Sequence, residues 1–110
     1  LYDKRLKGIK QLLLPPPPGS EPDHFDIFQN YEIEADNRDA LREHLTKSGI
    51  GTLLQWGGHC IHQFPDLGLN RDLPYTEQMT KRYMMLPLNL SVTDDDVVYV
   101  CDRIVEFYSR

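Results

Sequence analysis

The spacing of apolar residues predicts three short strands. Residues 25–35 alternate between apolar and polar positions, which is typical of a strand with one buried side and one solvent-facing side. Residues 50–56 and 86–90 are shorter runs with the composition of strands. Because Pro87 has no backbone N–H, we expect the last strand to lie at a sheet edge or to begin there. The expected buried side of the first strand comprises Ile27, Gln29, Tyr31, Ile33 and Ala35.

Helical spacing predicts four helices between and around these strands. They cover residues 1–8, 36–48, about 72–85 and 93–108. Each has an apolar stripe that recurs every three or four residues, which is the pattern of a helix packed on a core. The side chains expected to be buried on the last three helices are Leu41, Leu45, Tyr75, Met79, Val97, Val100, Cys101, Ile104 and Tyr108.

Polar residues and glycine mark where three helices begin or end. Gly49 closes the second helix, and Asp72 is expected to cap the third, with Pro74 in its first turn. Thr93 caps the last helix and is followed by the acidic run Asp94–Asp96. Three carboxylates at a helix N-terminus complement the helix dipole. A divalent-cation site is the alternative interpretation of that acidic run.

The order of elements predicts an α/β (α+β) two-layer sandwich, with a small three-stranded sheet covered by helices mainly on one face. A chain of 110 residues is long enough for one domain, so residues 1–110 are expected to be a single unit. The chain begins inside a helical pattern without a cap, which is typical of an element cut from a longer protein. Residues 1–8 are therefore interpreted as the tail of an interdomain helix.

Residues 15–22 contain four consecutive prolines and then Gly-Ser-Glu-Pro, which predicts a stiff, exposed connector. The run Pro15–Pro18 also suits a ligand of a proline-recognition domain. A free-standing interaction module that uses this run, or the long 57–74 loop, is therefore an alternative hypothesis for the whole chain.

Composition narrows the function classes. The net charge of −5 argues against a nucleic-acid surface and against an anionic membrane partner. No apolar run is long enough to span a bilayer. Two cysteines are too few for a disulfide framework and suit reduced thiols, which predicts a cytoplasmic protein.

Residues 50–64 carry most of the chemically distinctive side chains, including the single tryptophan and half of the histidines. A metal site here would lack the second ligand cluster that structural zinc sites use. A Cys–His nucleophilic dyad would lack an orienting third group. Ordinary loop histidines and a core tryptophan remain the simpler interpretation. The residues concerned are Trp56, Gly57, Gly58, His59, Cys60 and His62.

An ordered series of short motifs resembles the C-terminal small domain of the DegT/DnrJ/EryC1/StrS family, which comprises PLP-dependent sugar-nucleotide aminotransferases of fold type I. The resemblance extends over nearly the whole chain, and its strength lies in the order of the motifs. The matching segments are residues 2–6, 15–18, 37–45, 48–52, 66–68, 73–77, 86–88 and 90–100.

The resemblance implies a parent enzyme that transfers an amino group from an amino acid, glutamate by expectation, to a keto sugar nucleotide. In the family, the PLP lysine and its acidic partner lie in a large N-terminal domain. None of the lysines here matches that lysine, so this chain alone is expected to be inactive, to bind no cofactor and to contain no catalytic residue. They are Lys4, Lys7, Lys10, Lys47 and Lys81.

The resemblance also implies partners: the N-terminal PLP domain, a second subunit of a homodimer, and the nucleotide-sugar substrate. Many members carry His-Tyr-Pro followed by Leu-His where this chain has residues 55–63. That departure indicates a branch acting on a keto-deoxysugar nucleotide. The residues expected on the substrate side of the parent site are Gln55, Trp56, Gly57, Gly58, His59, His62 and Gln63.

Overall fold

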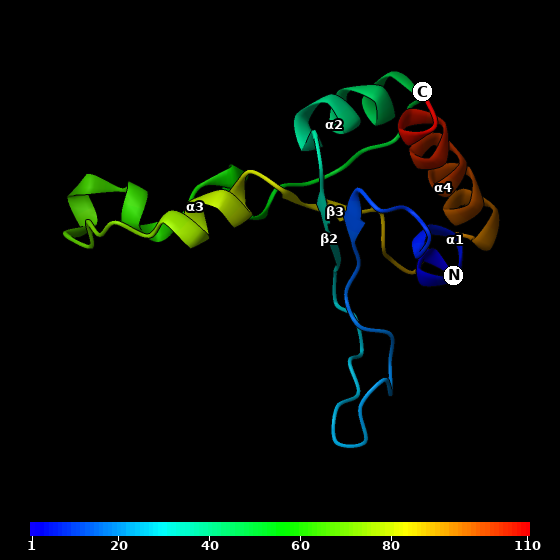
Figure 1. The fold of residues 1–110 in the computed structure, drawn as a ribbon, viewed down its shortest axis with the longest axis horizontal. Helices are drawn as coiled ribbons and strands as arrows, with labels where there is room; N and C mark the ends of the chain where they lie inside the picture. The colour runs from blue at the N-terminus through cyan, green and yellow to red at the C-terminus, as the bar shows by residue number, and fades with distance from the viewer.

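A computed structural model describes all residues from 1 to 110. Helices gather on one side of a small sheet, and two long segments project away from this body (Figure 1). The elements in order are α1 (Tyr2–Leu6), β1 (Leu12–Leu13), β2 (Tyr31–Ala35), α2 (Arg38–Lys47), the 3₁₀ turns Gln55–Gly58, Ile61–Gln63 and Pro65–Leu67, then α3 (Pro74–Thr80), β3 (Tyr83–Leu86) and α4 (Asp94–Tyr108).

The sheet is antiparallel, in the order β1-β2-β3. Ile33 pairs with Met84 in the centre, and Leu12 pairs with Ala35 at the outer strand. The expected buried side of β2 is confirmed for Tyr31, Ile33 and Ala35, which are all buried. A three-stranded α/β layer covered by helices is therefore the observed fold class.

The predicted strand boundaries were wrong in three places. The first strand covers only residues 31–35, because Phe28 adopts a left-handed conformation (φ 49°) and residues 25–30 have no partner strand, which leaves Ile27 exposed. Residues 50–56 contribute a single bridge, between Leu53 and Met85. The last strand is 83–86 and not 86–90, because α3 already ends at residue 80.

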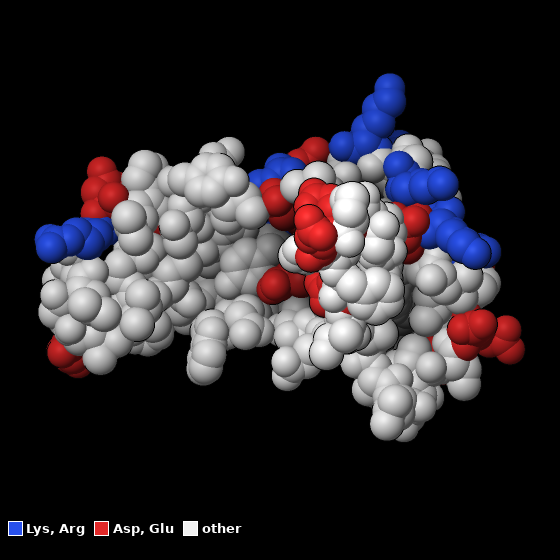
Figure 2. Space-filling model, turned by 90° about the horizontal axis from the view of Figure 1, so that it is seen from below, with Lys and Arg blue, Asp and Glu red and all other residues white.

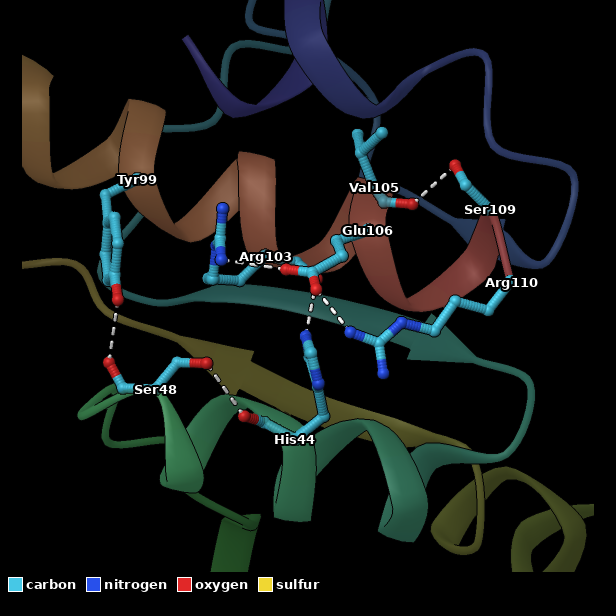
Figure 3. Close-up of polar contacts among 8 residues, drawn as sticks. All are labelled: His44, Ser48, Tyr99, Arg103, Val105, Glu106, Ser109 and Arg110. Atoms are coloured by element: carbon cyan, nitrogen blue, oxygen red, sulfur yellow. Dashed lines mark hydrogen bonds and ion pairs between the residues drawn. The ribbon is translucent and has the colours of Figure 1, made fainter.

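The helices account for most of the core. α4 packs against both α1 and α2, and α2 also contacts β2. Polar contacts join α2 to α4 as well: the Nε2 atom of His44 lies 3.0 Å from the Arg103 carbonyl oxygen, and the Tyr99 hydroxyl donates to the Ser48 carbonyl (Figure 3). The core cluster consists of Tyr2, Leu6, Tyr31, Ile33, Ala35, Leu41, Leu45, Ile50, Met84, Leu86, Val97, Val100, Cys101 and Ile104.

Helix ends follow the predictions in part. Thr93 caps α4 through a reciprocal box: its side-chain oxygen accepts from the Asp96 backbone N–H, and the Asp96 carboxylate accepts from Thr93. Gly49 closes α2 with a positive φ of 77°. The expected cap at Asp72 was wrong, since Leu73 is the N-cap of α3, with Pro74 inside its first turn.

The two projections are the hairpin loop (residues 14–30) and the arm (residues 54–80), which extend in different directions (Figure 1). They give a molecule of this size unusually long principal axes, 45 × 39 × 28 Å. Tyr75 lies on the arm and is exposed, so its predicted burial was wrong, and Met79 is only half-buried. The arm contains the candidate site.

Candidate functional site

The arm is held together by polar contacts between its loop and α3. The His62 ring is buried, and its Nε2 atom lies 3.2 Å from the Glu77 carboxylate. The Cys60 sulfur lies 2.6 Å from the hydroxyl oxygen of Thr80, which itself donates to the Thr76 carbonyl. The thiol is therefore the donor in the Cys60–Thr80 contact. These contacts fix the loop on one face of α3.

A left-handed turn begins the arm. Trp56 has φ 51°, Gly57 has φ 67° and Gly58 has φ 82°. Glycine adopts such angles at no steric cost, whereas a large residue such as tryptophan is strained there, by about 1–2 kcal/mol. A Cβ atom on Gly58 would lie 3.1 Å from the Leu54 side chain, which would have to shift to accommodate it.

The strain at Trp56 is not offset by packing within this chain, because 80% of the residue is exposed. Strained backbone positions cluster at sites of binding and catalysis, where they hold a side chain in a required place. The exposed indole therefore makes residues 55–59 the candidate binding part of the arm.

The outer face of the arm is apolar and hollowed. A cavity of about 470 Å³ is lined by five residues, of which His59 is the polar one. Uncharged surface extends along the arm on the left of Figure 2. The lining residues are Trp56, His59, Ile61, Phe64 and Leu67.

Arg38 anchors the base of the arm. This arginine is 8% exposed, and its Nη1 atom donates to the carbonyl oxygens of Thr80 and Tyr83, both at 3.0 Å. On the other side of the base, the Tyr83 hydroxyl donates to the Gln55 carbonyl at 3.4 Å. Burial raises the pKa of the Tyr83 phenol above its usual value.

A wider groove runs from this base along the uncovered side of the sheet to the hairpin loop. It has a volume of about 570 Å³, and Asp26, Glu32 and Glu34 give it an acidic character. Such a groove is electrostatically unfavourable for an anionic ligand. Pro16–Pro18 are exposed in the hairpin loop, and the interaction-module alternative stays a prediction.

The structure separates the predicted site residues into two groups. Trp56, Gly57 and His59 are exposed on the arm, while Gln55 and Gly58 are half-buried in the same turn. His62 and Gln63 have structural partners instead: His62 meets Glu77, and the Gln63 side chain accepts from the Cys60 backbone N–H at 2.8 Å.

Sequence reasoning missed the residues that support the arm, namely Arg38, Glu77 and Thr80. Glu77 and Thr80 are three positions apart and therefore share one face of α3. A polar face on a short helix is a usable signal for a loop docked through hydrogen bonds. Arg38 gave no such signal, because an arginine at the start of a helix usually faces solvent.

The lysines do not fit a covalent PLP site. All five are exposed, and Lys47 is paired with Glu43 on the surface of α2. A Schiff-base lysine needs a desolvated setting that lowers its pKa. No group of three or more histidine, cysteine, aspartate or glutamate side chains lies close enough together to hold a metal ion. No helix has the length and apolar character to cross a bilayer.

Known proteins resemble this chain in both sequence and fold. The chain is 31% identical over 87 residues to a "Pleiotropic regulatory protein" of Geobacillus stearothermophilus, covering 76% of this chain and 23% of the relative. It is 29% identical over 104 residues to the dTDP-4-dehydro-2,3,6-trideoxy-D-glucose 4-aminotransferase of Saccharopolyspora spinosa, covering 93% and 26%. The crystal structure of DesV from S. venezuelae superimposes with a TM-score of 0.84 at 25% identity, covering 99% of this chain and 29% of that one.

The fold and the arm define a small α/β domain of the kind found at the C-terminal end of sugar aminotransferases. The model of the DegT/DnrJ/EryC1/StrS aminotransferase family matches residues 1–105, and the chain belongs to that family. It spans about a quarter of the length of the curated relatives it matches.

Proposed function

We propose that this chain is the C-terminal domain of an enzyme that transfers an amino group from an amino acid, glutamate by preference, to a keto sugar nucleotide. The family match over residues 1–105 carries the proposal. The Saccharopolyspora spinosa relative is named for a 4-dehydro sugar nucleotide and a 4-amination, which supports the substrate class.

The cofactor of the proposed enzyme is pyridoxal phosphate, held by the remainder of the parent polypeptide. When bound, it supplies the electron sink that amino transfer requires. The lysines of this chain are exposed surface residues, so the isolated 110-residue chain is proposed to be inactive.

The role of this chain is to form the substrate-side wall of the site. The exposed Trp56 ring offers an apolar face against which a sugar or base can pack. Gly57 and Gly58 let the backbone approach the ligand closely, and His59 supplies a polar group that can donate or accept. His62 and Gln63 act indirectly, by holding the loop in place through Glu77 and the Cys60 backbone.

The test uses the full-length parent protein. We expect the absorption band of bound pyridoxal phosphate, and mass spectrometry should detect an amino sugar nucleotide when glutamate and a keto-deoxysugar nucleotide are supplied. A protein that binds pyridoxal phosphate but aminates none of a panel of keto sugar nucleotides would contradict the substrate class. One that binds no pyridoxal phosphate would contradict the enzyme class.

Two further parts of the proposal concern the parent as a whole. It is proposed to work as a homodimer in the cytoplasm. Sedimentation equilibrium at working concentration would show a mass of one subunit if the dimer proposal were wrong, and fractionation of the source cells would test the location.

A further inference from the structure

The arm has an inverted distribution of polar and apolar side chains. Its two buried side chains are polar, His62 and Thr80. Its large apolar side chains face outward instead. Burying polar groups while exposing apolar ones is the reverse of what water favours, even when the polar groups are paired. A segment built this way is arranged for contact with another surface.

The outward apolar side chains form one contiguous feature. We define the arm patch as Ile61, Phe64 and Leu67, which line the 470 Å³ hollow and are all substantially exposed. Trp56 and His59 form the wall of the same hollow toward the left-handed turn. Contiguous exposed apolar patches with a concave centre mark interaction sites, whereas single exposed apolar residues do not.

The chemistry of the hollow specifies its occupant. The lining contains no carboxylate and no basic group apart from His59, so an inserted charged side chain would lose its hydration without gaining a partner. An apolar side chain presented by a folded surface fits. The acidic groove at the arm base lies apart from the patch and shares none of its lining residues.

We infer that the arm patch is the docking surface for the remainder of the parent polypeptide, which inserts an apolar side chain into the hollow. The chain spans 23–29% of the length of its relatives, so most of the parent protein lies outside these residues. A covalently linked domain is present at high effective concentration and needs less interface area than a free partner to remain bound.

The inference rests on the proposed function only in placing this chain within a longer parent, and it requires no catalytic activity. It accounts for the hydrogen bonds to α3: they fix the loop on the arm so that the patch faces outward. The patch fixes the arm against the rest of the parent, and the adjacent Trp56 turn is thereby held toward the substrate.

Site-specific photocrosslinking of the full-length parent protein tests this surface. Benzoylphenylalanine is placed at Leu67 in the patch, and in a control protein at Val105, an exposed apolar position on α4. Unlabelled and nitrogen-15-labelled copies are mixed under conditions of subunit exchange, irradiated, digested and sequenced by mass spectrometry. The isotope pattern of each crosslinked peptide pair distinguishes contacts within one polypeptide from contacts between two.

The expected result is crosslinking from position 67 to peptides outside residues 1–110, within one polypeptide, at a yield well above that at position 105. If all crosslinked peptide pairs from position 67 carried mixed isotopes, the patch would contact a second copy of the protein, and the inference would be overturned. Yields no higher than the control, or crosslinks confined to residues 1–110, would also overturn it. Pyridoxal phosphate binding is recorded on the same samples, so a parent that gives the expected crosslinks but binds no pyridoxal phosphate would contradict the proposed function alone.

Discussion

At the scale of single residues, the arm depends on a few polar side chains that are paired with one another. His62 is buried and can reach the Glu77 carboxylate, while Cys60 can reach Thr80. A buried group that loses its partner is destabilised by its full desolvation cost, whereas an exposed group simply returns to water. The effect of a substitution here therefore depends on which partner is left behind.

Glu77→Gln illustrates this. It removes the carboxylate charge and leaves the His62 ring with a weaker partner, and we expect the arm to open more readily, by about 1–2 kcal/mol. Hydrogen exchange of backbone amides in residues 55–68 of the parent protein measures that opening. The matched control is Glu43→Gln, which breaks the exposed pair with Lys47 and should leave stability nearly unchanged. Equal effects in both variants would show that the His62 contact contributes nothing.

Trp56→Asn should separate binding from stability. Asparagine tolerates the left-handed conformation, so the substitution relieves the strain and loses no contact that is buried within residues 1–110. Any fall in the thermal stability of the parent should therefore stay far below that of a core substitution. Loss of the aromatic face should raise KM for the nucleotide sugar about tenfold, with kcat changed far less.

The control for that variant is Tyr75→Asn, which removes another exposed aromatic residue of the arm, 73% exposed. It should change neither KM nor stability. If Trp56→Asn lowered stability as Leu-to-Ala changes in a core do, or left KM unchanged, the substrate-side role of the indole would be refuted.

At the scale of elements, α4 depends on its N-cap. Thr93→Ala removes the oxygen that accepts from the Asp96 N–H and should cost about 0.5–2 kcal/mol, because α4 supplies four core residues. Denaturant unfolding of the parent protein, with the α4 region monitored by hydrogen exchange, measures the loss. Thr46→Ala, at an exposed position inside α2, is the control and should be neutral or slightly stabilising.

The same helix predicts an acid-sensitive contribution to stability. Hydrogen bonds from the backbone and side chain of Thr93 lower the pKa of Asp96. The hydrogen bond from Arg110, together with the nearby charge of Arg103, lowers the pKa of Glu106 (Figure 3). A carboxylate whose pKa is lowered by folding stabilises the folded state at pH values above its pKa in the unfolded state. That stabilisation is lost as the pH falls through its pKa in the folded state. Stability should therefore decline below about pH 4–5.

Unfolding free energies measured from pH 7 down to pH 3 test this, with Glu106→Gln as the informative variant. Its stability should depend less steeply on pH than that of the unmodified protein over the acid range. An identical slope would mean that the Glu106 ion pairs make no contribution.

The sequence predicted helices better than strands, for a physical reason. The α4 stripe and the Leu41–Leu45 pair are local patterns that one amphipathic element satisfies by itself. A strand exists only where a partner is present, so residues 25–30 and 50–56 did not form the expected strands. Residues 12–13, for which no strand was predicted, pair with β2 instead. The turn at residues 55–59 was located from the glycines and the tryptophan. The inward orientation of His62, by contrast, depends on Glu77, which lies fifteen residues further along the chain.

At the scale of the whole molecule, the body and the arm are two parts joined through a narrow base. The family model and the solved relatives match both parts, so the projecting shape belongs to the family fold. An arm that extends this far keeps the Trp56 turn in a fixed place relative to the body only if its base is rigid. In this chain the base contains a buried arginine, Arg38, whose guanidinium reaches two carbonyl oxygens where α3 ends and β3 begins.

Arg38→Met should therefore loosen the arm from the body. Methionine fills much of the same volume but donates no hydrogen bond, so the Thr80 and Tyr83 carbonyls lose a charged donor, at a cost of about 1.5–3 kcal/mol. Hydrogen exchange in the parent protein should show faster opening across residues 74–83 before any change in α4. KM for the nucleotide sugar should rise because the Trp56 turn loses its fixed position. Arg71→Met, at an exposed position on the arm, is the control and should change neither quantity. If Arg38→Met instead unfolded α4 and the arm together, the base would be part of one cooperative core, and the arm would move only with the whole domain.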